Sequence, residues 1–281
     1  MCDKEQVITF RQPATANLML DSADRNPGST WANFLISRNQ SILNGFFTRI
    51  GVTEMVLEWN TINVGNSDAI PGDFSVIIDP SGTPLTVTIN LIPSFYTVSE
   101  CMDEIAAELT LGAPGYSFSW VQVNDVWGLE CETSPGNVPT DFQVQSSVLA
   151  NRLTIELQTN TRAEIFTPDL RPYRYLDFTS FQLTYNQDLK DSSTATTVRD
   201  VLLRWYFAYD SPSSLDAKGF PILMGYTPFV LRRLYNPPKQ IKWDRIQPLG
   251  NLEFQVYNDN GVALFGDNAS NWLMTLQVSE N

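Results

Sequence analysis

Apolar and polar residues alternate along most of this chain, which is the pattern of half-buried β-strands. The alternation is clearest over residues 85–89 and 252–256, where every second side chain is apolar. Val, Ile, Thr and aromatic residues, which favour strands, dominate the other runs. The pattern predicts strands at residues 5–11, 16–21, 32–37, 54–60, 73–78, 85–90, 116–123, 126–131, 152–157, 177–185, 198–209, 229–235, 240–246, 251–257 and 271–278.

One segment has helical periodicity instead, over residues 98–109. Thr97 and Glu100 are spaced as a capping box, in which each side chain bonds the backbone of the other. We expect one apolar face, formed by Val98, Cys101, Met102, Ile105, Ala106 and Leu109. A weaker pattern indicates a second helix or a turn over residues 40–48.

Many short strands separated by Pro, Gly and Asn turns are typical of a β-sandwich or barrel. At 281 residues, the length permits either one elaborated sandwich or two smaller ones. The pattern therefore predicts an all-β protein, and length leaves the number of sandwiches open.

The net charge of −13 is unevenly distributed. Residues 51–150 contain no Lys or Arg and thirteen Asp or Glu, whereas the rest of the chain is formally neutral. This block is either a solvated acidic surface or a distinct outward-facing subdomain. Its charge disfavours contact with nucleic acid or an anionic membrane.

The chain contains no histidine, which excludes Ser-His-Asp and Cys-His nucleophiles, HExxH proteases and His-ligated catalytic metals. Its three cysteines, Cys2, Cys101 and Cys131, form no CxxC pair and predict neither a disulfide framework nor a zinc site. Glycine-rich phosphate loops are missing as well. We expect a protein that is not an enzyme, with no catalytic residue, cofactor or metal. We also expect no secretory leader and no membrane span, and hence a soluble protein made in a reducing compartment.

Two acidic groups permit other interpretations. Asp103, Glu104 and Glu108 could form a glycosidase pair or a divalent-cation site, but the exposed face of the predicted helix explains them more simply. Asp21 and Asp24 resemble part of a calcium loop that lacks its glycine and distal glutamate, so we expect a turn capped by Asp side chains.

The clearest basic cluster consists of Arg232, Arg233, Lys239, Lys242 and Arg245, with Tyr235 and Trp243 between them. It could bind nucleic acid through stacking and phosphate contacts. Its charge is modest beside a typical basic arm, so a subunit interface or a solvated strand pair is the preferred interpretation.

Several segments, in their order along the chain, resemble penton and minor capsid proteins of double-jelly-roll double-stranded DNA viruses, which include virophages, polinton-like viruses and giant viruses. Residues 20–25 (LDSADR) and 32–36 (ANFLI) are similar to the opening Ser-x-x-Arg turn and Asn-Phe-x-Ile strand of those proteins. Residues 85–89 (LTVTI), 95–100 (FYTVSE) and the helix resemble their strand–aromatic–helix unit, although Pro93-Ser94 replaces the usual Pro-Gly. The hairpin at 252–261 and the terminal strand at 272–281 complete a likeness that covers about two-thirds of the chain.

The resemblance implies a single jelly-roll β-sandwich with an inserted α+β element that contains one helix. Together with the break in charge, it places the barrel at residues 1–84 and 151–281 and the inserted acidic subdomain at 85–150.

The implied function is a structural capsid protein, a penton subunit forming pentamers at icosahedral vertices. The resemblance also implies that the partners are further copies of this chain and neighbouring capsomers of the major capsid protein. It implies a location in the virion, after synthesis in the host cytoplasm or nucleus. A minor cementing protein that bridges capsomers is the alternative within the same class. A carbohydrate-binding or hydrolytic β-sandwich is the alternative from another class.

Overall fold

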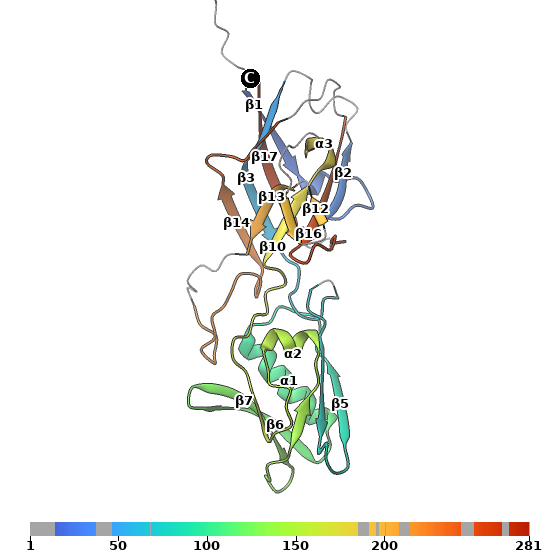
Figure 1. Cartoon of the computed structure of the whole chain (residues 1–281), viewed down its shortest axis with the longest axis vertical. Coiled ribbons are helices and arrows are strands. Elements are labelled where there is room, and N and C mark those ends of the chain that lie inside the picture. Colours follow the sequence, from blue (N-terminus) through green and yellow to red (C-terminus); the bar gives the residue numbers. More distant parts are fainter. Residues whose placement is uncertain are drawn as a thin grey trace, which may run out of the picture. The chain divides into compact units, whose positions relative to one another are not determined.

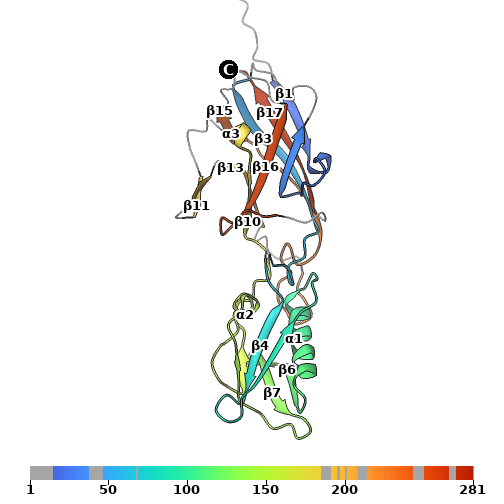
Figure 2. The same ribbon diagram turned by 90° about the vertical axis from the view of Figure 1, so that its right-hand side faces the viewer.

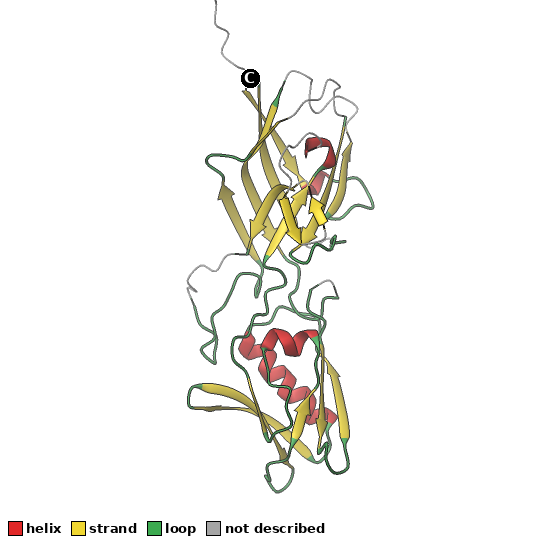
Figure 3. Cartoon of the chain, viewed as in Figure 1, coloured by secondary structure: helices red, strands yellow, loops and turns green. Residues whose placement is uncertain are grey.

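The computed structural model describes residues 15–37, 47–67, 69–184, 191–194, 197–199, 201–207, 214–242, 250–265 and 270–280. Among these residues, strands greatly outnumber helices, as the alternating pattern predicts (Figure 3). The expected strand at 5–11 lies outside the described residues. Of the expected helix or turn at 40–48, only residues 47–48 are described, and they belong to no helix or turn. No described helix is long and apolar enough to cross a membrane.

The chain forms two compact units. Unit 1 consists of Met1–Glu58, Leu176–Trp205 and Val230–Asn281, and unit 2 of Trp59–Tyr175 and Tyr206–Phe229. These boundaries differ from the expected insert at 85–150. A boundary at residue 85 would separate strands β4 (Asp73–Ile78) and β5 (Leu85–Asn90), which are paired along their whole length.

Unit 1 is built on eight strands that form two sheets (Figure 1). The strands are β1 (Thr15–Asp21), β2 (Asn33–Ser37), β3 (Arg49–Trp59), β10 (Tyr175–Thr179), β13 (Val201–Tyr206), β14 (Phe229–Leu234), β16 (Asn251–Asn258) and β17 (Asn271–Ser279). Short elements accompany them: η1 (Ser22–Asp24), α3 (Phe181–Thr184), β11 (Asp191–Thr194), β12 (Thr197–Arg199) and β15 (Gln240–Lys242).

The order of these strands identifies the topology. One sheet runs β1-β17-β3-β14, with β15 also paired to β3, and the other runs β13-β10-β16-β2. Numbered along the chain, the eight strands therefore lie in the orders 1-8-3-6 and 5-4-7-2. Two sheets of four strands linked in this way make a pair of Greek keys. The fold of unit 1 is a jelly roll. The expected fold class is confirmed.

The core of unit 1 is centred on Trp272 of β17. Its fully buried indole packs against three phenylalanines of the other sheet, with ring centroids 4.9 Å from Phe34, 5.4 Å from Phe254 and 5.5 Å from Phe178. The indole Nε1 donates to the Trp31 carbonyl oxygen at 2.9 Å, so the buried polar group is satisfied. The alternation of apolar residues along β16 and β17 places these side chains between the sheets.

The described residues of unit 2 form two three-stranded sheets and two helices (Figure 2). One sheet has the order β5-β4-β8 and the other β6-β7-β9. The elements not yet given are α1 (Val98–Gly112), β6 (Tyr116–Val123), β7 (Val126–Thr133), β8 (Phe142–Val144), α2 (Val148–Leu153) and β9 (Arg162–Glu164). The inserted α+β element is thus confirmed, with a second short helix, α2, that the sequence did not predict.

Helix α1 follows the sequence pattern closely. Thr97 Oγ1 accepts from Glu100 N, and the Glu100 carboxylate accepts from Thr97 N at 2.9 Å, which completes the expected capping box. All six residues of the expected apolar face are buried in one core with residues of both sheets. Burial of one face supplies most of the stability of such a helix.

Two strand predictions are wrong in part. The segment 152–157 begins inside α2, because the Ser147 side chain caps that helix and Leu149, Ala150 and Leu153 are buried on one face. The segment 177–185 leaves the sheet after Thr179 and turns into α3, where Thr184 Oγ1 donates to the Ser180 carbonyl.

Unit 2 is made of two segments of chain, 59–175 and 206–229. Four aromatic residues near the ends of these segments pack together. The Trp59 ring contacts Tyr173, Phe207 and Phe229 at centroid distances of 6.1, 5.1 and 6.4 Å. Each of the four lies within three residues of a boundary between the units along the chain. The backbone contributes a hydrogen bond of 3.0 Å from Phe207 N to Arg174 O. These contacts join the segment 59–175 to the segment 206–229.

We expect replacement of Thr97 by alanine to lower the stability of α1 by about 1 kcal/mol, because the backbone N–H of Glu100 loses the hydroxyl that caps it. Amides of α1 should then exchange with deuterium about fivefold faster, as measured by mass spectrometry. Thr159→Ala, an exposed threonine in a loop of the same unit, is the control and should leave α1 unchanged. Equal exchange in both variants would contradict the capping role.

Replacing Phe207 by alanine should destabilise unit 2 by about 3–5 kcal/mol, the usual cost of removing a buried aromatic ring. The loss of stability is measured by a denaturant titration that is monitored through the deuterium exchange of unit 2 peptides. Phe265→Ala removes a ring that is 74% exposed and should change stability by less than about 0.5 kcal/mol. A loss below about 1 kcal/mol for Phe207→Ala would show that the aromatic contacts do not hold the two segments together.

Candidate subunit interface

The basic segment singled out in the sequence does not form one continuous surface. Arg232 of β14 is exposed and forms an ion pair with Glu54 of β3 in the same sheet. Arg233 points to the opposite face of β14, where its guanidinium lies 4.3 Å from the centroid of the buried Trp205 ring. Adjacent strand residues point to opposite faces, so the two arginines cannot act as a single patch.

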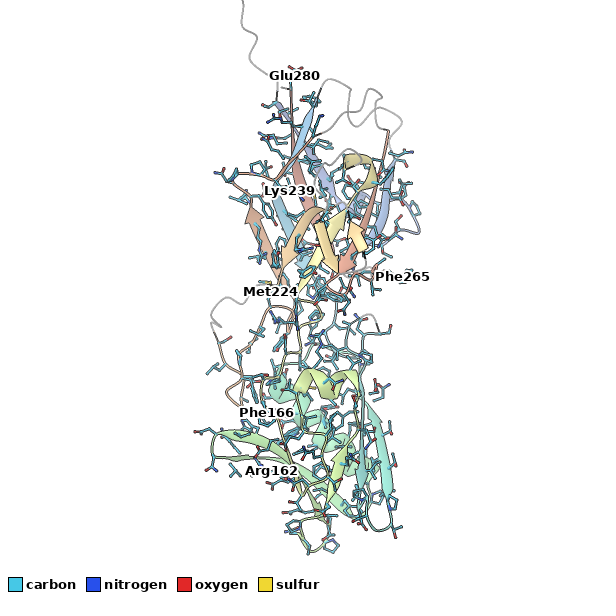
Figure 4. All side chains as sticks on the ribbon, viewed as in Figure 1. Arg162, Phe166, Met224, Lys239, Phe265 and Glu280 are labelled. Carbon is cyan, nitrogen blue, oxygen red and sulfur yellow. The ribbon has the colours of Figure 1, made fainter. Side chains whose placement is uncertain are left out.

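Two of the remaining basic residues, Lys239 and Lys242, lie along the same edge of unit 1. Lys239 is exposed, and its Nζ donates to the Val201 carbonyl at 3.1 Å (Figure 4). Lys242 is exposed on β15, and Arg245 lies outside the described residues. The Tyr235 hydroxyl is buried, and burial raises its pKa to about 12. Trp243 also lies outside the described residues.

A larger candidate surface is the outward side of the sheet β1-β17-β3-β14, here called the outer sheet face. Its exposed apolar side chains are Met19 (80% exposed), Leu273, Val230 and Leu234, with Val56 half-buried among them. The strand register aligns Leu273 with Val56, and Thr275 with both Met19 and Glu54. Contiguous exposed apolar area of this kind is typical of protein–protein contacts.

Part of this face is hollowed. A depression of about 400 Å³ is lined by Met19, Asp21, Asp24, Glu54, Val56 and Leu273, among others. Acidic groups thus lie toward the β1 edge, whereas Arg232, Lys239 and Lys242 lie toward the β14 and β15 edge. A head-to-tail contact between two copies requires this kind of complementarity between opposite edges.

Asp21 and Asp103, two of the acidic residues considered as chemical sites, have structural roles. Asp21 Oδ1 accepts from Ala23 N at 2.8 Å, which confirms the expected Asp-capped turn. Asp103 forms an ion pair with Lys218, whose ammonium also lies 5.5 Å from the Trp127 ring centroid. Among the described residues, no group of three or more His, Cys, Asp or Glu side chains could hold a metal ion.

Asp216 is a structural residue that sequence analysis missed. Its Oδ2 accepts from Ser99 N at 2.8 Å, in the first turn of α1, and its Oδ1 accepts from Lys218 N and Phe220 N. A carboxylate at a helix N-terminus is favoured by the helix dipole. Only a contact between distant parts of the chain reveals this role, because Asp216 lies 117 positions from Ser99.

Cys101 and Cys131 are free and buried. Burial, with a smaller effect of Glu132, raises the pKa of Cys131 to about 12, and burial together with Glu104 raises the pKa of Cys101 still further. Both thiols therefore stay protonated at neutral pH, which is unsuited to nucleophilic chemistry.

Comparison with known proteins yields matches by structure alone. No protein-family model matches the chain, and no curated protein matches it. The mavirus penton protein is similar over 96% of this chain and 100% of its own, with 12% identity and a TM-score of 0.49. A chain in the cryo-EM structure of the Sputnik virophage is similar over 96% of this chain and 98% of its own, with 9% identity and a TM-score of 0.43.

We expect Cys101 and Cys131 to react with iodoacetamide at pH 8 at least about 100-fold more slowly in the folded protein than in guanidinium chloride. Peptide mass spectrometry separates the two sites, and the unfolded sample serves as the control. Labelling of Cys131 at the unfolded rate would mean that its thiolate is accessible and would reopen the case for cysteine chemistry.

Proposed function

We propose that this chain is a structural capsid protein, a penton subunit that assembles into closed rings of five at the vertices of an icosahedral double-stranded DNA virus. The observation that carries the proposal is a jelly-roll unit with an exposed apolar outer sheet face and edges of opposite charge. Jelly rolls of this topology occur in viral capsids and in lectins, so the fold alone leaves the function open. The motif order noted in the sequence favours the capsid.

In this proposal each copy presents the β14 and β15 edge to the β1 edge of the next copy. Such a contact is heterologous, and it gives a ring when the rotation closes. Val230 and Leu234 lie on the exposed side of β14 and would be covered in the contact. The partners are then further copies of the chain and, around the ring, capsomers of the major capsid protein in the virion.

A minor cementing protein that bridges capsomers remains the second candidate, since an apolar sheet face suits that contact equally well. Cryo-electron microscopy of particles that contain the chain distinguishes the two. Density at the five-fold vertices supports the penton, and density between or beneath capsomers supports the cementing protein.

We expect the purified protein to form pentamers at micromolar concentration, detected by mass photometry and sedimentation velocity. The double variant Val230→Asp, Leu234→Asp should weaken each contact more than about 100-fold, because two buried apolar side chains contribute about 3 kcal/mol or more together. The variant should therefore remain monomeric.

Leu111→Asp is the matched control, because Leu111 lies in unit 2 and is 77% exposed, and it should assemble normally. Far-UV circular dichroism checks that all variants fold. A wild-type protein that stays monomeric, or a double variant that assembles like the wild type, would contradict the proposed contact.

A further inference from the structure

Unit 2 carries most of the negative charge of the protein. It contains sixteen Asp or Glu residues and only five basic residues, which are Arg152, Arg162, Arg171, Arg174 and Lys218. Because unit 2 is strongly negative, the positions of these five cations determine where an anion is attracted.

Two of the five basic residues form ion pairs with acidic side chains of unit 2. Arg162 donates to Glu130 at 2.8 Å and to Glu164 at 3.2 Å (Figure 4). Lys218 is paired with Asp103. The other three, Arg152, Arg171 and Arg174, line one pocket of about 570 Å³. A volume of this size suits a ligand of one or two sugar rings.

The pocket is assembled from three segments of unit 2, residues 151–154, 166–174 and 220–223. Two hydrogen bonds fasten the second segment to the end of α2: Asp169 N donates to Arg152 O at 2.8 Å, and Thr167 N donates to Thr154 Oγ1 at 2.8 Å. Thr154 itself ends the helix in the left-handed conformation. The wall of the pocket is therefore built before any ligand arrives, which lowers the entropic cost of binding.

Arg171 and Asp169 provide a fixed base for the pocket. Arg171 is fully buried, and its guanidinium donates to both Asp169 oxygens, at 2.9 and 2.6 Å, and to the Phe207 carbonyl at 3.2 Å. Burial acts to raise the pKa of Asp169, but the Arg171 contacts and the nearby charge of Arg152 outweigh it, so the pKa lies below its ordinary value. The Arg171–Asp169 pair is thus neutral overall, and Arg152 adds a further positive charge to the lining of the pocket.

Arg152 is the group in this pocket that is best suited to a ligand. It is half-buried in the last turn of α2, and its guanidinium forms no hydrogen bond or ion pair with the described part of the chain. A guanidinium offers a planar fork of donors that matches a carboxylate in two parallel bonds.

An aromatic surface lies beside this cation. Phe166 lines the pocket and remains 57% exposed, and Phe220, Pro221 and Leu223 continue the apolar wall. Asn151 adds an amide that can both donate and accept. An exposed ring, a small number of polar groups and one charged fork are what a sugar ring with a carboxylate requires, since its C–H face is apolar and its edge is polar.

We propose that this pocket binds a singly charged carboxylated sugar, with the carboxylate held by Arg152 and the apolar face of the ring resting on Phe166. The inference goes beyond assembly, and it assigns sugar recognition to unit 2 and not to the jelly-roll sandwich. A polyanion is disfavoured, because every charge beyond the reach of the arginines would face the acidic surface of unit 2.

The test uses the full-length protein and five probes in NMR titrations: 3′-sialyllactose, lactose, methyl β-glucuronide, methyl β-glucoside and a heparin tetrasaccharide. We expect at least one carboxylated sugar to bind at least tenfold more tightly than its neutral partner. Arg152→Gln should weaken that binding about tenfold or more, as for loss of a charge-assisted hydrogen bond. Arg152→Lys keeps the positive charge but loses the planar fork of donors, so its affinity should lie between those of the wild type and Arg152→Gln.

Phe166→Ala should reduce binding and abolish saturation transfer to the C–H protons of the ring. Leu111→Ala is the matched control, since it removes an exposed apolar side chain from unit 2 outside the pocket, and it should bind normally. The proposal is overturned if neither carboxylated sugar binds better than its neutral partner, if Arg152→Gln binds as the wild type does, or if a heparin tetrasaccharide binds more tightly than either. None of these readings depends on the oligomeric state, so failure here and failure of the capsid proposal are separate results.

Discussion

The constraint on which the structure depends is that unit 2 must be closed from two separate lengths of chain. Trp59, Tyr173, Phe207 and Phe229 meet this constraint by packing their rings together close to the ends of both lengths. Each ring belongs to a segment that continues directly into a jelly-roll strand. A long insertion costs little free energy if its ends are held close together, because loop-closure entropy grows only slowly with length. The jelly roll can therefore carry two insertions and keep its strand order.

The net negative charge of the protein is concentrated in unit 2. Unit 2 holds sixteen acidic and five basic residues, whereas unit 1 is close to neutral. The sequence showed the acidic block but ended it at residue 150. The structure extends the unit to Tyr175 and so includes four arginines, of which Arg152, Arg171 and Arg174 line the pocket. A hundred residues without a base, followed by clustered arginines, was the signal that could have pointed to this pocket.

The predicted interface residues illustrate why a cluster in sequence need not be a cluster in space. Arg232 and Arg233 are neighbours in the chain, yet one pairs with Glu54 on the outer sheet face and the other covers Trp205 on the opposite side. The apolar residues that accompany Arg232, such as Met19 and Leu273, come from strands at the two ends of the chain. An interface of this kind is a property of the sheet and not of any one segment.

The sequence by itself determined the local elements: the alternating strands, helix α1 with its capping box, the buried helical face and the absence of histidine-dependent chemistry. These follow from side-chain periodicity and from residue types, which act over a few positions. Only the tertiary structure decided that β1 pairs with β17, that Asp216 caps α1 and that three arginines share a pocket. Those pairings join residues that lie far apart in the chain, and many alternative partners have the same local pattern. Their choice depends on how all the apolar faces are buried together, which no single segment specifies.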